Sequence, residues 1–208
     1  MKVPSIAKGL AVAMGLGAAA AVSAQVLLAP GGAPGIMTAT LAGGPVGWVA
    51  FLSSPPTPDD LGNFTAQVDS AVTVGNTYGP AAMTFWYKLT NVDQTPNGAP
   101  LVSLGVPMPS AVPVIVDQQN AGRLSGLGIN TGASISFFWT ANPVLETQFS
   151  GWQAIETPFT RYVHGKVGAI DGTSEDVVAL VPIPEPTTYV GLFALGLAGF
   201  AAFRRFRA

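Results

Sequence analysis

The sequence contains a single histidine, His164, within the run Arg-Tyr-Val-His-Gly at residues 161–165. A Ser-His-Asp triad would need this imidazole. A zinc site built on histidine would need further ligands, and the chain has no cysteine to supply them. No G-x-S-x-G or H-E-x-x-H motif accompanies His164. We therefore expect it to be a structural strand residue, and the sequence predicts no catalytic residue, no metal ligand and no cofactor.

Residues 171–176 form the densest acidic stretch and read Asp-Gly-Thr-Ser-Glu-Asp. Three carboxylates could contribute to a calcium site, because Ca²⁺ is bound by several oxygen ligands. The stretch lacks the alternating acidic order of an EF-hand loop, so a solvated turn is the favoured interpretation. Glycosidase chemistry would need two facing carboxylates. The acidic residues between positions 25 and 183 leave many such pairs open.

Aromatic side chains gather in two short runs, with one more tryptophan between them and the C-terminus. In a strand, neighbouring residues face opposite sides of the sheet, so about half of these side chains would be core. The others could form a platform on which sugar rings stack. Core packing is the favoured interpretation, and the platform is the alternative. The aromatic residues concerned are Phe85, Trp86, Tyr87, Phe137, Phe138, Trp139 and Trp152.

Short apolar or alternating runs, separated by clusters of Gly, Pro and Asn, predict that the middle of the chain is all-β. The 25 glycines and 18 prolines make long helices unfavourable there. We expect an antiparallel β-sandwich of immunoglobulin-like or jelly-roll type, after a loose arm at residues 25–44. The expected strands are 46–52, 64–74, 83–92, 112–117, 135–140, 147–153, 161–170 and 177–181.

Charge in the middle of the chain excludes one class of partner. Residues 25–183 contain four basic and ten acidic side chains, which gives a net charge of −6. Nucleic-acid binding depends on a basic surface that neutralises phosphates. No such surface is encoded here, so we expect no nucleic-acid partner.

The first 24 residues have the three parts of a secretory signal. Lys2 and Lys8 provide a basic start, and residues 9–22 form an apolar run that is short and rich in Ala and Gly. The alternative is an uncleaved membrane helix, which would need a longer run. Small residues then predict a signal-peptidase site and a mature chain that starts at Gln25. The site is formed by Val22, Ala24 and Gln25.

The C-terminal residues 184–208 combine an extended motif, an apolar segment and a basic end. Prolines keep the motif out of a helix, so a processing enzyme could bind it as an extended strip. The apolar segment, residues 189–203, would span about 22 Å as a helix, which is short for a bilayer core of about 30 Å. By the positive-inside rule, both basic ends stay cytoplasmic and the middle is exported. The motif is Pro184, Glu185 and Pro186, and the basic cluster is Arg204, Arg205 and Arg207.

This combination of motif, apolar segment and arginine cluster resembles the PEP-CTERM proteins of Gram-negative bacteria. The residues before the motif, Val-Pro-Ile at 181–183, depart slightly from the family's usual Val-Pro. The resemblance implies an inner-membrane precursor that is processed by an exosortase, and an association with extracellular polysaccharide or biofilm matrix. A plain C-terminal anchor is the alternative.

Taken together, these features predict a signal peptide at 1–24, an ectodomain at 25–183, and a sorting and transmembrane segment at 184–208. We expect a non-enzymatic protein of the cell surface or extracellular matrix. Its partners would be exosortase, transiently the inner membrane, and as a candidate extracellular polysaccharide. The alternatives are a secreted carbohydrate-binding module, favoured if Trp86, Trp139 or Trp152 is exposed on one sheet face, and an enzyme that acts on polysaccharide.

Overall fold

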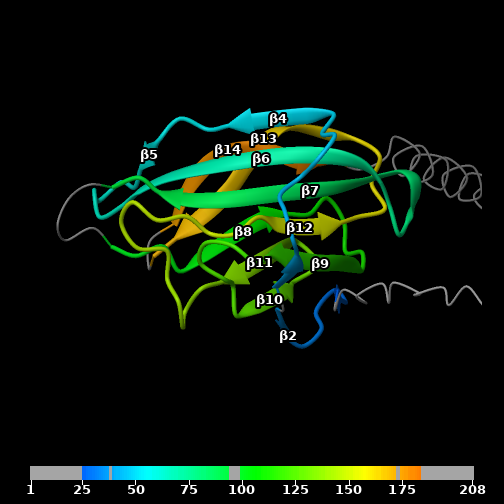
Figure 1. The fold of residues 1–208 in the computed structure, drawn as a ribbon, viewed down its shortest axis with the longest axis horizontal. Coiled ribbons are helices and arrows are strands. Elements are labelled where there is room, and N and C mark those ends of the chain that lie inside the picture. Colours follow the sequence, from blue (N-terminus) through cyan, green and yellow to red (C-terminus); the bar gives the residue numbers. More distant parts are fainter. Residues whose placement is uncertain (1–24, 38, 94–98, 172–173, 184–208) are drawn as a thin grey trace, which may run out of the picture.

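The computed structural model describes residues 25–37, 39–93, 99–171 and 174–183. Within these ranges the chain forms fourteen strands and no helix. The strands make two sheets, and all but one of their pairings are antiparallel. The prediction of an all-β, mostly antiparallel domain is confirmed. Figure 1 shows the two longest strands side by side along the long axis of the molecule.

The larger sheet has eight strands. Its order is β1 (Val26–Leu28), β9 (Val114–Gln119), β12 (Gln153–Glu156), β7 (Gly79–Asn91), β6 (Thr65–Asn76) and β4 (Ala50–Ser53). Two short strands lie off this path. They are β3 (Ala39–Leu41), which is parallel to β9, and β5 (Thr57–Pro58), which pairs with β6.

The smaller sheet has six strands, all antiparallel to their neighbours. Its order is β14 (Ser174–Pro182), β13 (Tyr162–Ile170), β8 (Ser103–Pro107), β11 (Ser134–Phe138), β10 (Leu127–Asn130) and β2 (Gly35–Ile36).

Alternation along β6 and β7 explains how the larger sheet acquires one apolar face. In β6, Val68 and Val72 are fully buried on the inner face. Thr73, which follows Val72 and faces the other side, is only half-buried. In β7, Phe85 and Tyr87 face the interior and Trp86 faces the opposite side. The smaller sheet supplies the facing core residues, such as those of β8 and β11. Each large apolar side chain buried there contributes about 1.5–3 kcal/mol. These facing residues are Leu104, Val106, Ile135, Phe137, Val167 and Ala169.

The edge strand β14 is tied directly to the larger sheet. Its Leu180 carbonyl accepts a hydrogen bond from the Tyr87 hydroxyl at 2.7 Å, and the Leu180 N–H donates to Ser70 Oγ at 3.0 Å. Burial raises the pKa of the Tyr87 hydroxyl well above its usual value. β14 ends at Pro182, and the next residue, Ile183, still donates its N–H to the Arg161 carbonyl. The fold therefore continues up to the beginning of the Pro-Glu-Pro motif.

Residues 25–44 are not the loose arm that their composition predicted. Strand β1 pairs with β9 in the larger sheet and β2 pairs with β10 in the smaller one, so this segment joins both sheets. Leu28 and Met37 are 2% and 6% exposed and belong to the core. Asn130 Nδ2 fixes the segment by donating to the Leu28 and Val112 carbonyls at 3.0 and 2.9 Å. Tertiary contacts override the low strand propensity of Ala, Gly and Pro here.

Most expected strands overlap an observed one, but the strand expected at 147–153 is wrong. Only Gln153 of that range lies in a strand, while Phe149 and Ser150 make isolated bridges. Thr147 has φ of 59°, which interrupts extended backbone. Strands β8 and β10, each of which contains a glycine, were not expected from the sequence.

Candidate functional site

The outer side of the larger sheet carries polar and aromatic side chains in register across four strands. Cross-strand pairs place Thr73 beside Thr84, and Thr84 beside Glu156. The next row contains Trp86, opposite Ala154, which in turn lies opposite Asp117. We call this side the outer face. Its members are Asp69, Ala71, Thr73, Thr84, Trp86, Lys88, Ile115, Asp117, Gln119, Trp152, Ala154 and Glu156.

One end of the outer face is hollowed into an acidic pocket of about 190 Å³ around Trp86, Asp117 and Glu156. The indole Nε1 of Trp86 donates to Thr73 Oγ1 at 3.0 Å, which fixes the ring within the pocket. Because Asp117 pairs with Ala154 and Glu156 pairs with Ile115, the two carboxylates are diagonal neighbours on adjacent strands. Glycosidases use a pair of neighbouring carboxylates to cleave the glycosidic bond.

Hydrogen bonds from the chain engage both carboxylates of the acidic pocket. Asp117 is 4% exposed and accepts from the Thr40 hydroxyl and, at 2.7 Å, from the Gln118 N–H. Glu156 accepts from Gln25 Nε2 at 2.8 Å and from the N–H and hydroxyl of Thr77 at 3.1 and 2.6 Å. Each of the four oxygens thus has at least one donor. This pattern indicates that the two carboxylates hold β3, the N-terminus of the domain and the β6–β7 hairpin in place.

Tyr78, in the β6–β7 hairpin, lies close enough to the Glu156 carboxylate to be affected by its charge. Partial burial, and secondarily the Glu156 carboxylate, raise the pKa of its hydroxyl. That hydroxyl donates to the Pro113 carbonyl at 2.9 Å, which links the hairpin to the segment before β9.

The middle of the outer face holds a cation between aromatic rings. Lys88 Nζ lies 2.6 Å from Asp69 Oδ2, 5.3 Å from the ring centre of Trp152 and 6.0 Å from that of Phe149. These distances are within the range of cation–π contacts. Phe149 bridges to Thr90 of β7 and is 49% exposed. Trp86, Trp152 and Phe149 therefore lie on the same side of the sheet, with Lys88 near the last two.

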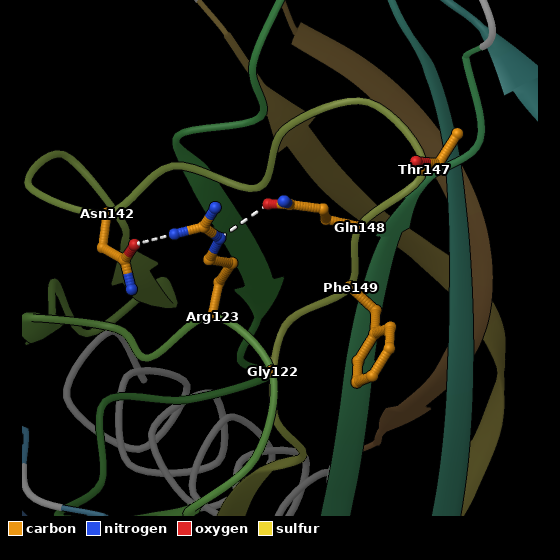
Figure 2. A pocket seen from close by; sticks show the side chains of 6 residues that line it. All are labelled: Gly122, Arg123, Asn142, Thr147, Gln148 and Phe149. Carbon is orange, nitrogen blue, oxygen red and sulfur yellow. Dashed lines mark hydrogen bonds between the residues drawn. The ribbon is translucent and has the colours of Figure 1, made fainter.

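Beyond Phe149 a second hollow, which we call the arginine pocket, has a volume of about 360 Å³. Figure 2 shows the Arg123 guanidinium between two amide side chains. Nε donates to Gln148 Oε1 at 2.6 Å, and Nη1 donates to Asn142 Oδ1 at 2.5 Å. The pocket is lined by Gly122, Arg123, Asn142, Thr147, Gln148 and Phe149.

The backbone around the arginine pocket is irregular and held by specific contacts. Thr147 is the one described residue other than glycine with a positive φ, and this conformation strains a β-branched side chain. The Arg123 carbonyl accepts from Trp139 Nε1 at 3.0 Å, which ties the loop to a fully buried ring. Gly122 has φ of 66° and lies against the Phe149 backbone, where a Cβ would meet the carbonyl at 2.6 Å.

The aromatic residues singled out in the sequence divide by face. Phe85, Tyr87, Phe137 and Trp139 are core side chains, each at most 1% exposed. Trp86 and Trp152 are half-buried and share the outer face, whereas Phe138 is half-buried on the outer side of the smaller sheet. Two of the three tryptophans named as markers of a binding face therefore lie together. Phe149, which the sequence analysis did not single out, joins them.

The other residues singled out do not assemble into a site. His164 lies on β13 opposite Leu180 and is exposed. Among the described residues, no group of three or more His, Cys, Asp or Glu side chains could hold a metal ion. In the acidic stretch, Asp176 is exposed and pairs with Lys166 at 3.4 Å. In the sequence alone, Arg123 is only one of four basic residues between positions 25 and 183.

The predicted processing sites fall almost entirely outside the described residues. Val22 and Ala24 lie there, as do the motif Pro184, Glu185 and Pro186 and the basic cluster Arg204, Arg205 and Arg207. Gln25 is described, is exposed and hydrogen-bonds to Glu156. No described segment is a helix of the length and apolarity needed to cross a membrane.

Comparison with protein families identifies the C-terminal end of the chain. Residues 182–205 match the family model described as the PEP-CTERM protein-sorting motif. The chain carries a PEP-CTERM sorting motif. The match begins at Pro182, the last residue of β14, so it leaves the two sheets unassigned. No curated protein and no solved structure matches the chain.

A PEP-CTERM sorting motif indicates export, a membrane-anchored precursor and an exosortase as the processing partner. The expected resemblance is thereby confirmed for the C-terminal end.

Proposed function

We propose that this chain is the precursor of a non-enzymatic surface or matrix protein that exosortase processes at Pro184-Glu185-Pro186. The match to the PEP-CTERM motif at residues 182–205 carries this proposal. The position of the motif supports the proposal, since the last described strand ends at Pro182 and the motif follows after Ile183 alone. Because proline disfavours a helix, a processing enzyme could bind this stretch as an extended strip next to the domain.

The proposed path begins at the inner membrane. A signal peptide at 1–24 directs export, and the apolar segment at 189–203 holds the precursor with its arginines inside. The exported part is a sandwich of immunoglobulin-like or jelly-roll type, which the two sheets around one core support. After processing, the mature protein runs from Gln25 to near Glu185 and resides at the cell surface or outside the cell, in contact with biofilm matrix.

Fractionation of the native host tests the processing step. We expect the wild-type protein to lose residues 187–208 in cells with exosortase, as measured by intact mass. Glu185→Ala should accumulate as a full-length membrane form while its export continues. Glu146→Ala, which changes an acidic side chain within the domain, is the matched control and should be processed normally. Wild-type protein that retains its tail in the presence of exosortase would show that the segment is an ordinary anchor.

A second candidate function is binding of carbohydrate at the outer face. The observation that favours it is the row formed by Trp86, Trp152 and Phe149, with Lys88 among them. Aromatic rings bury large apolar areas at little conformational cost, and such rings suit the apolar sides of sugar units. The proposal does not depend on Asp117 and Glu156, because these carboxylates already accept hydrogen bonds from the chain.

Substitution of the aromatic residues tests the binding function. Trp152→Ala should weaken retention on a neutral polysaccharide gel by about two- to ten-fold, the range expected for loss of one aromatic contact. Phe138→Ala removes a half-buried aromatic ring from the outer side of the smaller sheet and should leave retention unchanged. Equal effects of the two substitutions would reject the outer face as the binding surface.

A further inference from the structure

Arg123 differs from the paired lysines of the described domain in having only neutral partners. Lys88 forms an ion pair with Asp69, and Lys166 forms one with Asp176. Arg123 instead donates to the amide oxygens of Gln148 and Asn142, and no described carboxylate lies within ion-pair distance of it. A guanidinium cannot lose its charge at physiological pH. The arginine pocket therefore contains a full positive charge that no carboxylate of the described residues balances.

The guanidinium also keeps unused donors. Of its five N–H groups, one on Nε and one on Nη1 are used, while Nη2 makes no hydrogen bond to any described residue. Because the amide oxygens of Gln148 and Asn142 face the arginine, their NH₂ groups are turned away from it and add further donors. The pocket thus offers many donors around one positive charge, which is the chemistry that recognises an anion.

Charge elsewhere in the domain limits which anion is suitable. Residues 25–183 carry a net charge of −6, so a densely charged polymer would be repelled as a whole. A single carboxylate matches the planar fork of the guanidinium and brings one negative charge. The exposed ring of Phe149 adds an apolar surface at the edge of the same pocket and continues the aromatic row of the outer face.

We propose that the arginine pocket binds a carboxylated sugar unit, of the uronic acid type, within a sparsely charged glycan. Arg123 binds the carboxylate with its free N–H groups, and the amides of Asn142 and Gln148 hold the guanidinium in position and donate to neighbouring hydroxyls. Phe149 contacts the face of the sugar. This assignment rests on the proposed carbohydrate-binding function and names the chemistry of its ligand.

The test compares two probes that differ at one carboxyl group, which is charged in one and esterified in the other. They are a tetrasaccharide with one glucuronic acid and the same compound as its methyl ester, and each is titrated calorimetrically into the full chain in detergent. The wild type should bind the acid about ten- to a hundred-fold more tightly than the ester, the range for a charge-assisted hydrogen-bonded pair. Arg123→Gln should remove this difference and leave ester binding as it was. Arg123→Lys should restore only part of it, because lysine lacks the fork.

Arg161→Gln is the matched control, since Arg161 is exposed and lies outside the pocket. It should bind both probes as the wild type does. Circular dichroism and urea unfolding establish that each variant is folded. If Arg123→Gln does not fold, the difference in affinity of the wild type for the acid and the ester is sufficient to test whether the carboxylate is recognised.

Three outcomes would overturn the proposal. Equal binding of acid and ester by the wild type would show that the carboxylate is not recognised, while carbohydrate binding itself would stand. Equal or tighter binding of an acidic tetrapeptide with the same charge would point to a peptide ligand. Absence of binding to either saccharide would remove both this assignment and the carbohydrate-binding function. Exosortase processing, measured separately by mass, would be unaffected by any of them.

Discussion

The acidic pocket within the outer face and the arginine pocket beyond Phe149 both contain charged side chains, but the charges have different partners. In the acidic pocket, Asp117 and Glu156 accept hydrogen bonds from Thr40, Gln25, Thr77 and the backbone, so the chain itself satisfies the carboxylates. In the arginine pocket, Arg123 contacts two neutral amides and keeps donors free. The first arrangement joins segments of the fold, and the second leaves room for a ligand.

This difference shows which property marks a binding site in a small β domain. Two carboxylates beside a tryptophan would attract attention first, yet their partners are internal. An N–H group that faces a pocket and has no partner in the protein is a better indication of a binding site. Such a group needs water or a ligand as its hydrogen-bond partner. Substitutions in one pocket or the other test this difference.

Asp117→Ala should have the largest effect on stability. It removes a buried acceptor and leaves the Thr40 hydroxyl and the Gln118 N–H without their partner, at a cost of about 1–3 kcal/mol in the free energy of unfolding. Urea unfolding measures this loss. Asp60→Ala, at an exposed position, is the control and should change stability by less than about 0.5 kcal/mol. If the two variants were equally stable, Asp117 would not hold the fold together.

Thr147→Asn should raise the free energy of unfolding, by less than Asp117→Ala lowers it. Thr147 has φ of 59°, a conformation that Asn tolerates better than a β-branched residue. We expect a gain of about 0.5–1 kcal/mol in the free energy of unfolding. We also expect weaker binding of the glucuronate tetrasaccharide, since Thr147 lines the arginine pocket. Loss of stability instead would mean that the threonine side chain is needed where it lies.

The smallest effect concerns the hydroxyl of Tyr78. Burial and the negative charge of Glu156 raise its pKa, so Glu156→Gln should lower the pKa of Tyr78 towards its usual value of 10.0 without reaching it. Absorbance titration at alkaline pH, with Tyr78→Phe as the reference, isolates this group. Because the pKa is raised in the folded state, Tyr78 stabilises the fold below pH 10, and that contribution is lost as the pH rises further. An unchanged pKa in Glu156→Gln would show that the carboxylate has no influence on the hydroxyl.

Elements with regular alternation were predictable from the sequence. Strands β6, β7 and β13 overlap their expected ranges because apolar and polar residues alternate over many positions. Strand β1 (Val26–Leu28) could not be predicted in this way, because it is short and is followed by a stretch rich in Gly and Pro. Its pairing with β9 stabilises it. The range 147–153 has strand-like composition, but the backbone at Thr147 and the loop contacts of Arg123 prevent a continuous strand.

The sorting motif was evident in the sequence, because a processing enzyme reads a short linear stretch. The arginine pocket was not, because its members come from three separate loop positions. Nothing near Arg123 in the sequence indicates that its partners are Asn142 and Gln148 rather than an acid. The aromatic row could be predicted in part. Trp86 and Trp152 were marked as candidates, whereas Phe149 was placed inside a strand and its exposure depends on the irregular backbone before it.

The short distance between β14 and the motif limits how a processing enzyme can approach it. Only Ile183 separates the last strand residue, Pro182, from Pro184, and one residue of extended chain reaches no more than about 3.6 Å. In the proposed processing step, the enzyme therefore meets the motif with the folded domain directly beside it. The bulk of the two sheets, and not the linear motif alone, would then decide which enzyme clefts can accept this substrate.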